Sequence, residues 1–182
     1  MNLMAFAASH QPDSLNASLI DCAVACLPDT EVTQYPYEAL ELEGFNHATL
    51  KMRGFSDKVQ QVYTLFQQAD GFVIASPEYN WSYPGTLKNI IDWMSCFSPN
   101  PFEAKPVILL CATPSENSGL IGLQHLKNTL GGWLGAYVYP ISYGLGQADK
   151  RIIDGKIVDA AKQERLEQVI QGFSEFCARH CS

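Results

Sequence analysis

The feature that most constrains this chain is a short apolar run that stops at a polar turn and is followed by an amphipathic segment, within residues 71–93. Residues 72–75 are too few for a buried helix and are soon followed by Pro77, so they predict an interior strand of a parallel sheet. Pro84 suits the first turn of a helix. The apolar residues that follow at helical spacing are Leu87, Ile90, Ile91 and Met94. The loop 76–83 therefore leaves the carboxyl end of a strand, where open α/β sheets bind ligands.

The beginning of the chain predicts a second unit of strand, loop and helix. Residues 3–8 are apolar, a polar loop follows, and apolar residues then recur at helical spacing over 17–27. Asn16 is a candidate N-cap, and the free N–H groups of a helix N-terminus favour a phosphate. The hydroxyls of Ser9 and Ser14 and the amide of Asn16 could complete such a site. The alternative is that these residues only cap the helix.

The rest of the chain continues the alternation. Strands are expected at 31–37, 106–112 and 136–141, the first of them a short strand or an edge strand because of Pro36. Helices are expected at 56–68, 84–97, 122–134 and 159–179, and residues 38–54 as an irregular surface excursion. Five strands and five helices in alternation predict an α/β fold in three layers.

Composition excludes several classes of function. The chain has 182 residues, 47% of them hydrophobic, and a net charge of -7, which argues against nucleic acid or an anionic membrane as partner. It has no apolar run near the ~20 residues of a membrane-spanning helix and no signal peptide, so we expect a cytoplasmic protein. Its six cysteines and four histidines are dispersed, so no metal site is expected. Motifs for hydrolysis or phosphoryl transfer are also missing.

The central loop and helix resemble the signature of the NADPH-dependent FMN reductase family of flavodoxin-like proteins. The matching positions are Pro77, Glu78, Tyr79, Asn80, Pro84, Gly85, Leu87, Lys88, Asn89, Asp92 and Trp93. The alternative interpretation is a proline-rich loop that joins two core elements. Lys88, Asn89 and Asp92 are interpreted as structural supports of the loop or of an interface.

The resemblance implies one flavodoxin-like FMN-binding domain over residues 1–182, with a five-stranded parallel sheet of order 2-1-3-4-5. In this order the chain winds in opposite directions from the first and third strands, which opens a crevice at their carboxyl ends. The Ser9 and Pro77 loops follow these two strands, so both loops indicate one site. The implied cofactors are FMN and, as electron donor, NADPH or NADH.

The resemblance also implies the residues that hold FMN. They are Ser9, His10, Gln11, Ser14, Leu15, Asn16, Pro77, Glu78, Tyr79, Asn80, Trp81, Ser115, Ser118 and Gly119. No catalytic side chain is expected, because the flavin carries the redox chemistry. Two positions depart from the family pattern: Ala8 replaces a glycine, and the first loop has no arginine. Neutralisation of the phosphate would then fall to the helix dipole, amide groups and His10.

The expected activity is hydride transfer from NAD(P)H through FMN to a small acceptor such as a flavin or quinone. The alternatives are a flavodoxin-like electron carrier and a non-catalytic module with the same fold. Trp81 stands where the family commonly has a small residue, so its indole either narrows the acceptor space, stacks on the flavin or packs in a subunit interface. A homodimer or homotetramer is expected, with Trp93 and Phe97 as aromatic surface that a partner covers.

Overall fold

In the computed structural model, which describes residues 1–11, 13–27 and 30–180, the chain folds around a mostly parallel sheet. Its strands are β1 (Asn2–Ala7), β2 (Glu31–Gln34), β3 (Gly71–Ala75), β4 (Pro106–Ala112) and β5 (Tyr137–Val138). Their order is β2-β1-β3-β4-β5, and every neighbouring pair is parallel. The predicted fold class and strand order are confirmed, and β2 is the expected edge strand.

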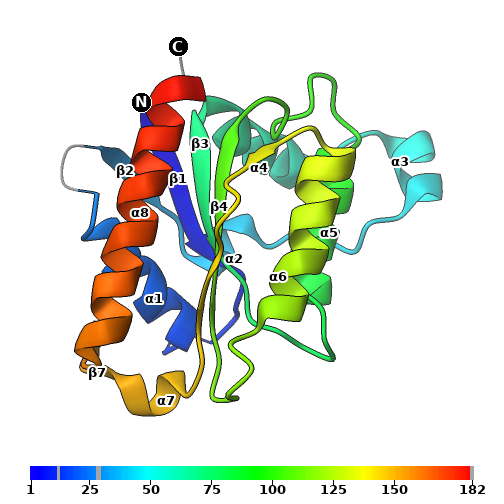
Figure 1. The fold of residues 1–182 in the computed structure, drawn as a ribbon. Helices are drawn as coiled ribbons and strands as arrows, with labels where there is room; N and C mark the ends of the chain where they lie inside the picture. Colours follow the sequence, from blue (N-terminus) through cyan, green and yellow to red (C-terminus); the bar gives the residue numbers. More distant parts are fainter. Residues whose placement is uncertain (12, 28–29, 181–182) are drawn as a thin grey trace.

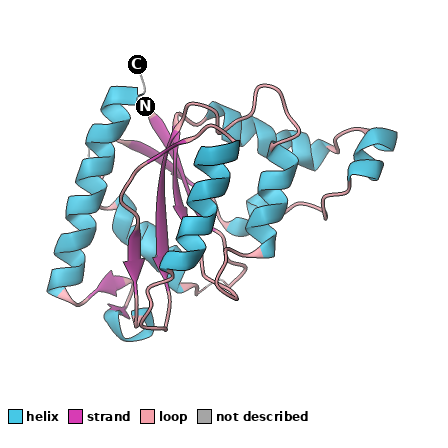
Figure 2. Cartoon of the chain, turned by 45° about the vertical axis from the view of Figure 1, so that its right-hand side comes forward, coloured by secondary structure: helices cyan, strands magenta, loops and turns pink. Residues whose placement is uncertain are grey.

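Helices cover both faces of the sheet (Figures 1 and 2). One face carries α1 (Leu15–Val24) and α8 (Ala160–His180). The other carries α4 (Asp57–Gln68), α5 (Gly85–Met94) and α6 (Leu120–Lys127), the last continued by the wider helical turn η1 (Asn128–Trp133). The predicted three layers are therefore present, and among the described residues no helix is long and apolar enough to cross a membrane.

Alternation along the strands builds two hydrophobic cores. In β1, Met4 and Phe6 face the core beneath α4 and α5, whereas Leu3 and Ala5 face the core beneath α1 and α8. The strands β3 and β4 are buried along their whole length. Because both faces of a parallel sheet are covered, these strands are continuous apolar runs rather than alternating ones.

The prediction of a continuous fifth strand at 136–141 was wrong. Only Tyr137 and Val138 pair as β5, and pairing with β4 resumes two residues out of step at β6 (Tyr143–Leu145), where Leu110 lies opposite Tyr143. Pro140 lies in the break. Proline has no N–H group to donate to a neighbouring strand, so it interrupts a strand at this position.

The predictions for the helices need three corrections. The N-cap of α1 is Ser14, whose hydroxyl accepts a hydrogen bond from the Asn16 N–H, so the helix begins earlier than expected and Asn16 lies inside it. The stretch 38–54, predicted as irregular, contains most of α2 (Tyr37–Leu40) and all of α3 (His47–Arg53). Residues 148–157, for which nothing was predicted, form α7 (Ala148–Arg151) and the hairpin of β7 (Ile152–Ile153) and β8 (Lys156–Ile157).

The prediction that Trp93 and Phe97 leave aromatic surface for a partner was also wrong. Trp93 is only 2% exposed, because the segment before α3 covers it: the indole Nε1 donates to the Glu43 carbonyl at 2.8 Å, and the Phe45 ring packs edge-on against it. Phe97 stacks between the rings of Phe55 and Tyr63. The chain thus covers with its own residues the surface that was assigned to a second subunit.

Candidate functional site

A cleft of about 250 Å³ lies where the loops after β1, β3 and β4 meet. Its walls are formed by Ser9, Gln11, Ser14, Leu15, Asn16, Pro77, Glu78, Tyr79, Ala112, Thr113 and Pro114. All three loops leave the carboxyl ends of their strands, and β1 and β3 are the neighbouring strands between which the winding direction reverses. Loops far apart in the sequence are therefore brought together where such folds bind ligands.

The cleft contains some of the residues that the sequence nominated and leaves others outside. The first loop and the start of α1 contribute Ser9, Gln11, Ser14, Leu15 and Asn16, and the second contributes Pro77, Glu78 and Tyr79. The nominated residues outside its walls are His10, Asn80, Trp81, Ser115, Ser118 and Gly119. The third loop was expected at the site as residues 113–119, with Ser115, Ser118 and Gly119 nominated from it, whereas the cleft is lined at this point by Ala112, Thr113 and Pro114.

A second cleft, of about 420 Å³, shares Ser9 and Gln11 but lies between α1 and the end of β2. It is larger, yet it involves neither the loop after β3 nor the loop after β4. The His10 ring lies near its edge, packed edge-on against Tyr37. We place the candidate site in the smaller cleft, because only that cleft unites the two sequence motifs at the switch point.

Asn16 joins the start of α1 to the end of β4. Its side-chain Nδ2 donates to the Ala112 carbonyl at 2.9 Å, and its Oδ1 accepts from the Ala112 N–H at 2.9 Å. The residue is 3% exposed. The amide that was predicted to bind a phosphate directly is thus engaged with backbone, and its main effect is to fix the N-terminus of α1 against the third loop.

The side-chain hydroxyls of the first loop also form hydrogen bonds with backbone groups. Ser14 Oγ accepts from the Asn16 N–H at 3.2 Å, and Ser9 Oγ accepts from the Gln11 N–H at 3.3 Å. Among the described residues that form its walls there is no lysine or arginine. An anion bound here would depend on N–H groups at the first turn of α1 and on the helix dipole, which is the usual basis of phosphate binding at a helix N-terminus.

Glu78 fixes the second loop to α6. Its Oε2 accepts from the Gly122 N–H at 2.6 Å, and its Oε1 accepts from Asn117 Nδ2 at 3.2 Å. Gly122 permits this approach, since a Cβ there would lie 3.1 Å from Glu78 Cγ and from the Ser82 backbone. A carboxylate at a helix N-terminus also interacts favourably with the dipole. The side chain of Glu78 therefore positions the loop.

Cys111 lies beneath this junction and is fully buried. Burial, with the nearby Glu78 carboxylate as a second cause, raises the pKa of its thiol to about 12. Gly119 has a left-handed φ of 66°, and a Cβ on it would lie 2.2 Å from Cys111 Sγ. The thiol stays protonated at neutral pH and acts as a packing group rather than a nucleophile.

The third loop is supported by a segment that the sequence analysis did not interpret. Gln147 donates through its N–H to the Ser115 carbonyl at 2.9 Å and through Nε2 to Glu116 Oε1 at 2.9 Å. Gly144 packs so closely that a Cβ on it would lie 2.2 Å from the Ser118 carbonyl oxygen. The glycines at 144 and 146 were the available signal, because they permit close approach of backbones.

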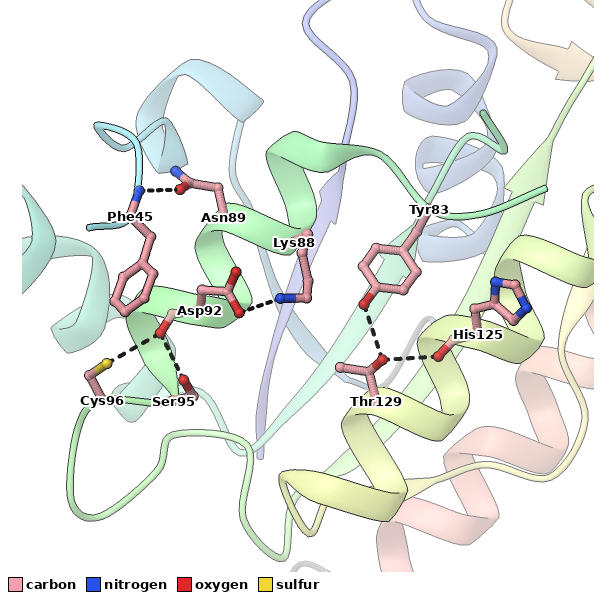
Figure 3. A network of polar contacts seen from close by, with 9 residues as sticks. All are labelled: Phe45, Tyr83, Lys88, Asn89, Asp92, Ser95, Cys96, His125 and Thr129. Atoms are coloured by element: carbon pink, nitrogen blue, oxygen red, sulfur yellow. Dashed lines mark hydrogen bonds and ion pairs between the residues drawn. The ribbon is translucent and has the colours of Figure 1, made fainter. Parts of the chain in front are cut away.

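Figure 3 shows the contacts of Lys88, Asn89 and Asp92 on α5, residues that are not among those lining the cleft. Asn89 Oδ1 accepts from the Phe45 N–H at 2.7 Å, and its Nδ2 donates to the carbonyls of Leu42 and Glu43. Lys88 pairs with Asp92 one turn later on the helix surface. Asn89 therefore has a structural role, but it holds the segment before α3 rather than the loop after β3, and Lys88 and Asp92 pair within α5.

Comparison with known proteins identifies the family. The model of the NADPH-dependent FMN reductase family matches residues 1–150. The chain belongs to this family. A quinone reductase of Escherichia coli (strain K12) is 33% identical over 129 residues, which cover 69% of this chain and 68% of that protein. An NAD(P)H-dependent FMN reductase of Pseudomonas aeruginosa is 29% identical over 130 residues, covering 69% of each.

Among solved structures, the chain is similar to the flavoenzyme NAD(P)H:(acceptor) oxidoreductase FerB of Paracoccus denitrificans. The TM-score is 0.84 at 22% identity, with 98% of each chain covered, which shows the shared fold. Family membership confirms the resemblance found in the sequence. It also confirms the expected class of activity, an FMN-dependent NAD(P)H oxidoreductase, and the expected cofactors.

Proposed function

We propose that the cleft between the loops after β1, β3 and β4 is the FMN site. We also propose that electrons from NAD(P)H reach a small acceptor, such as a quinone or flavin, by way of the FMN bound there. The observation that carries the proposal is the meeting of the Ser9 and Pro77 loops at the switch point of the sheet. When bound, FMN supplies the redox chemistry by accepting a hydride and passing the electrons on.

The residues present fit such a group. The first turn of α1 offers N–H groups to a phosphate, and Ser9, Gln11 and Ser14 provide polar walls beside it. At the opposite wall, Pro77 and Tyr79 provide apolar surface suited to a flat ring. The hydrogen bonds of Asn16 and Glu78 hold these walls in fixed positions, so the site is preorganised.

The finer features rest on family resemblance. A quinone acceptor is supported by the name of the Escherichia coli relative. We further propose a single domain over residues 1–182, a cytoplasmic location and a homo-oligomer. A light-scattering mass of 20.1 kDa at micromolar concentration, the mass of one chain, would contradict the last of these.

The test of the site compares two substitutions that each add one negative charge to an exposed glutamine. Gln11 lines the proposed FMN cleft, whereas Gln34 lines only the second cleft. Gln11→Glu should weaken FMN binding about fivefold, since a new carboxylate repels the phosphate at a partly exposed site by ~1 kcal/mol. Gln34→Glu should leave FMN affinity unchanged, and riboflavin, which has no phosphate, should bind both variants alike.

Titration by flavin fluorescence measures these affinities. Anaerobic bleaching of the bound flavin by NADPH and by NADH then tests the activity and determines the preferred donor. Equal effects of the two substitutions would place FMN elsewhere. Binding of FMN without reduction by either nucleotide would instead favour an electron carrier.

A further inference from the structure

The loop after β3 ends in a tight turn whose two central residues are both left-handed. The N–H of Tyr79 donates to the Ser82 carbonyl at 2.8 Å, and the N–H of Ser82 donates to the Tyr79 carbonyl at 3.0 Å. Asn80 has φ 51° and Trp81 has φ 63°. This is the pattern of a type I′ turn, in which asparagine followed by glycine is strongly preferred. A tryptophan in the second position strains the backbone.

The exposure of Trp81 leaves it little packing with which to offset this strain. The turn itself is well supported, since the Ser82 backbone contacts Gly122, and Ser82 Oγ lies 3.4 Å from His125 Nδ1. The Trp81 side chain, however, is 57% exposed. A strained backbone and an exposed indole both disfavour tryptophan for stability. Such residues occur where the local conformation serves binding or catalysis.

Trp81 is one of four exposed apolar residues on the turn and at the start of α6, which we call the 79–121 patch. The patch consists of the exposed side chains of Tyr79, Trp81, Leu120 and Ile121. The turn and the first turn of α6 touch through Ser82 and Gly122, so these residues stand on adjoining backbone. Tyr79 also lines the cleft, so one member of the patch stands at the cleft wall. An exposed apolar patch of this kind is typical of a binding surface.

The charges around the patch favour an uncharged ligand. Residues 79–82 and 120–123 include no lysine or arginine. Two carboxylates, those of Glu78 and Glu116, lie in the adjoining loops, where Asn117 contacts the former and Gln147 the latter. An anionic acceptor would find no lysine or arginine in these two segments and would meet both carboxylates. A flat, neutral aromatic acceptor would gain stacking area on the indole.

We propose that Trp81 is the specificity-determining residue for the acceptor, and that its indole provides a stacking surface for neutral planar quinones at the mouth of the cleft. The inference rests on the proposed function and names the acceptor class. In the overall reaction NAD(P)H and one proton reduce the quinone to the hydroquinone, with NAD(P)⁺ as the other product. Trp81 contributes only binding. The indole is not among the residues that line the cleft, so we assign it to added surface at the mouth rather than to a narrowing of the acceptor space.

The test compares Trp81→Gly with Trp81→Phe, which keeps an aromatic ring, and with Trp133→Gly, which removes an 81% exposed tryptophan from η1. Binding of menadione, a neutral naphthoquinone, is measured by equilibrium dialysis against the FMN-loaded protein at pH 8 without nicotinamide. Trp81→Gly should weaken menadione binding about tenfold, Trp81→Phe at most about threefold, and Trp133→Gly should have no effect.

Two further readouts separate binding from folding. The melting temperature of Trp81→Gly should stay unchanged or rise by about 2 °C, since relieved strain is partly offset by the greater unfolded-chain entropy of glycine. The ratio of kcat/KM for menadione to that for the anion ferricyanide should fall about tenfold in Trp81→Gly.

Three results would overturn the inference: unchanged menadione affinity in Trp81→Gly, equal losses in Trp81→Gly and Trp81→Phe, or a lowered oligomer mass in Trp81→Gly, which would assign the indole to an interface. These outcomes are distinct from failure of the proposed function. If the wild-type protein binds FMN and is bleached by NAD(P)H while Trp81→Gly binds menadione normally, only the role of Trp81 falls. If the wild-type protein does not bind FMN at all, the proposed function itself is refuted.

Discussion

Asn16 and Ala112, 96 positions apart in the chain, exchange two hydrogen bonds of 2.9 Å between one side-chain amide and one backbone unit. At the point where β4 ends, the side-chain amide forms the two hydrogen bonds that the backbone of a neighbouring strand would form. Through this pair the first helix and the third loop keep a fixed spacing, and both line the candidate site.

Asn16→Ala should destabilise the fold by about 2–5 kcal/mol, because the N–H and carbonyl of Ala112 would both be left buried without a partner. Urea unfolding followed by circular dichroism measures the change. Asn46→Ala is the control: it removes the exposed asparagine that caps α3 and should cost about 1 kcal/mol or less. Similar losses in the two variants would show that the Ala112 pair contributes little.

Gly122→Ala should lower stability by about 1–3 kcal/mol and weaken FMN binding, although alanine is the better helix former. The added Cβ would lie 3.1 Å from Glu78 Cγ and from the Ser82 backbone, so the loop after β3 must move away from α6. Gly132→Ala provides the matched control, since nothing lies within 4 Å of a Cβ at that position. Thermal unfolding and FMN titration are measured for both variants. An unchanged FMN affinity in Gly122→Ala would contradict a coupling between Gly122 and the FMN site through the loop after β3.

Cys111 should make the fold sensitive to alkaline pH. Its thiol pKa is raised in the folded state from 9.0 to about 12, so the folded state holds the proton more tightly than the unfolded chain does. The resulting stabilisation is complete below pH 9 and is lost as pH rises toward 12, at up to about 1.4 kcal/mol per pH unit. Unfolding by urea at pH 8, 9.5 and 10.5 should show this decline.

Cys111→Ala should make the free energy of unfolding less dependent on pH from pH 9 upward. Tyr143→Phe should have this effect only above pH 10, because burial raises the pKa of the Tyr143 hydroxyl from 10.0 to about 12. Identical pH profiles in wild type and Cys111→Ala would refute the assignment.

FMN affinity should stay constant or increase when NaCl is raised from 20 to 300 mM. The chain carries a net charge of -7, and the cleft walls, as far as the structure describes them, contain no lysine or arginine. The long-range field therefore repels a phosphate, and salt screens that repulsion. Equilibrium dialysis at each salt concentration measures the trend. A steep loss of affinity with salt would reveal a cationic side chain at the phosphate.

Asn89→Ala should loosen the segment 42–55 without a direct effect on the cleft. Three hydrogen bonds to the backbone at residues 42, 43 and 45 would be lost, and Trp93 would lose part of its cover. We expect faster tryptic cleavage at Lys51 and Arg53 and a red shift of tryptophan emission. Lys88→Ala, which breaks only a surface pair, should change neither, and equal cleavage rates in the two variants would count against this role of Asn89.

The sequence predicts the sheet and its order because buried parallel strands are short apolar runs separated by amphipathic helices. For the same reason it predicts which two loops meet at the candidate cleft, since the two motifs follow β1 and β3. It fails where a residue has a distant partner. Nothing local in Asn16 indicates Ala112 as its partner, and nothing local in Trp93 indicates that residues 43 and 45 cover it.

Because the fifth strand is broken at Pro140, the two segments that pair with β4 on this side of the sheet, β5 and β6, are independent of each other. β5 takes its register from Pro106 and Val107, whereas β6 takes its register independently from Leu110 to Ala112. Residues inserted between 139 and 142 would therefore lengthen a surface loop and leave both pairings intact. This edge of the fold can vary in length during evolution while the loops around the cleft keep their positions.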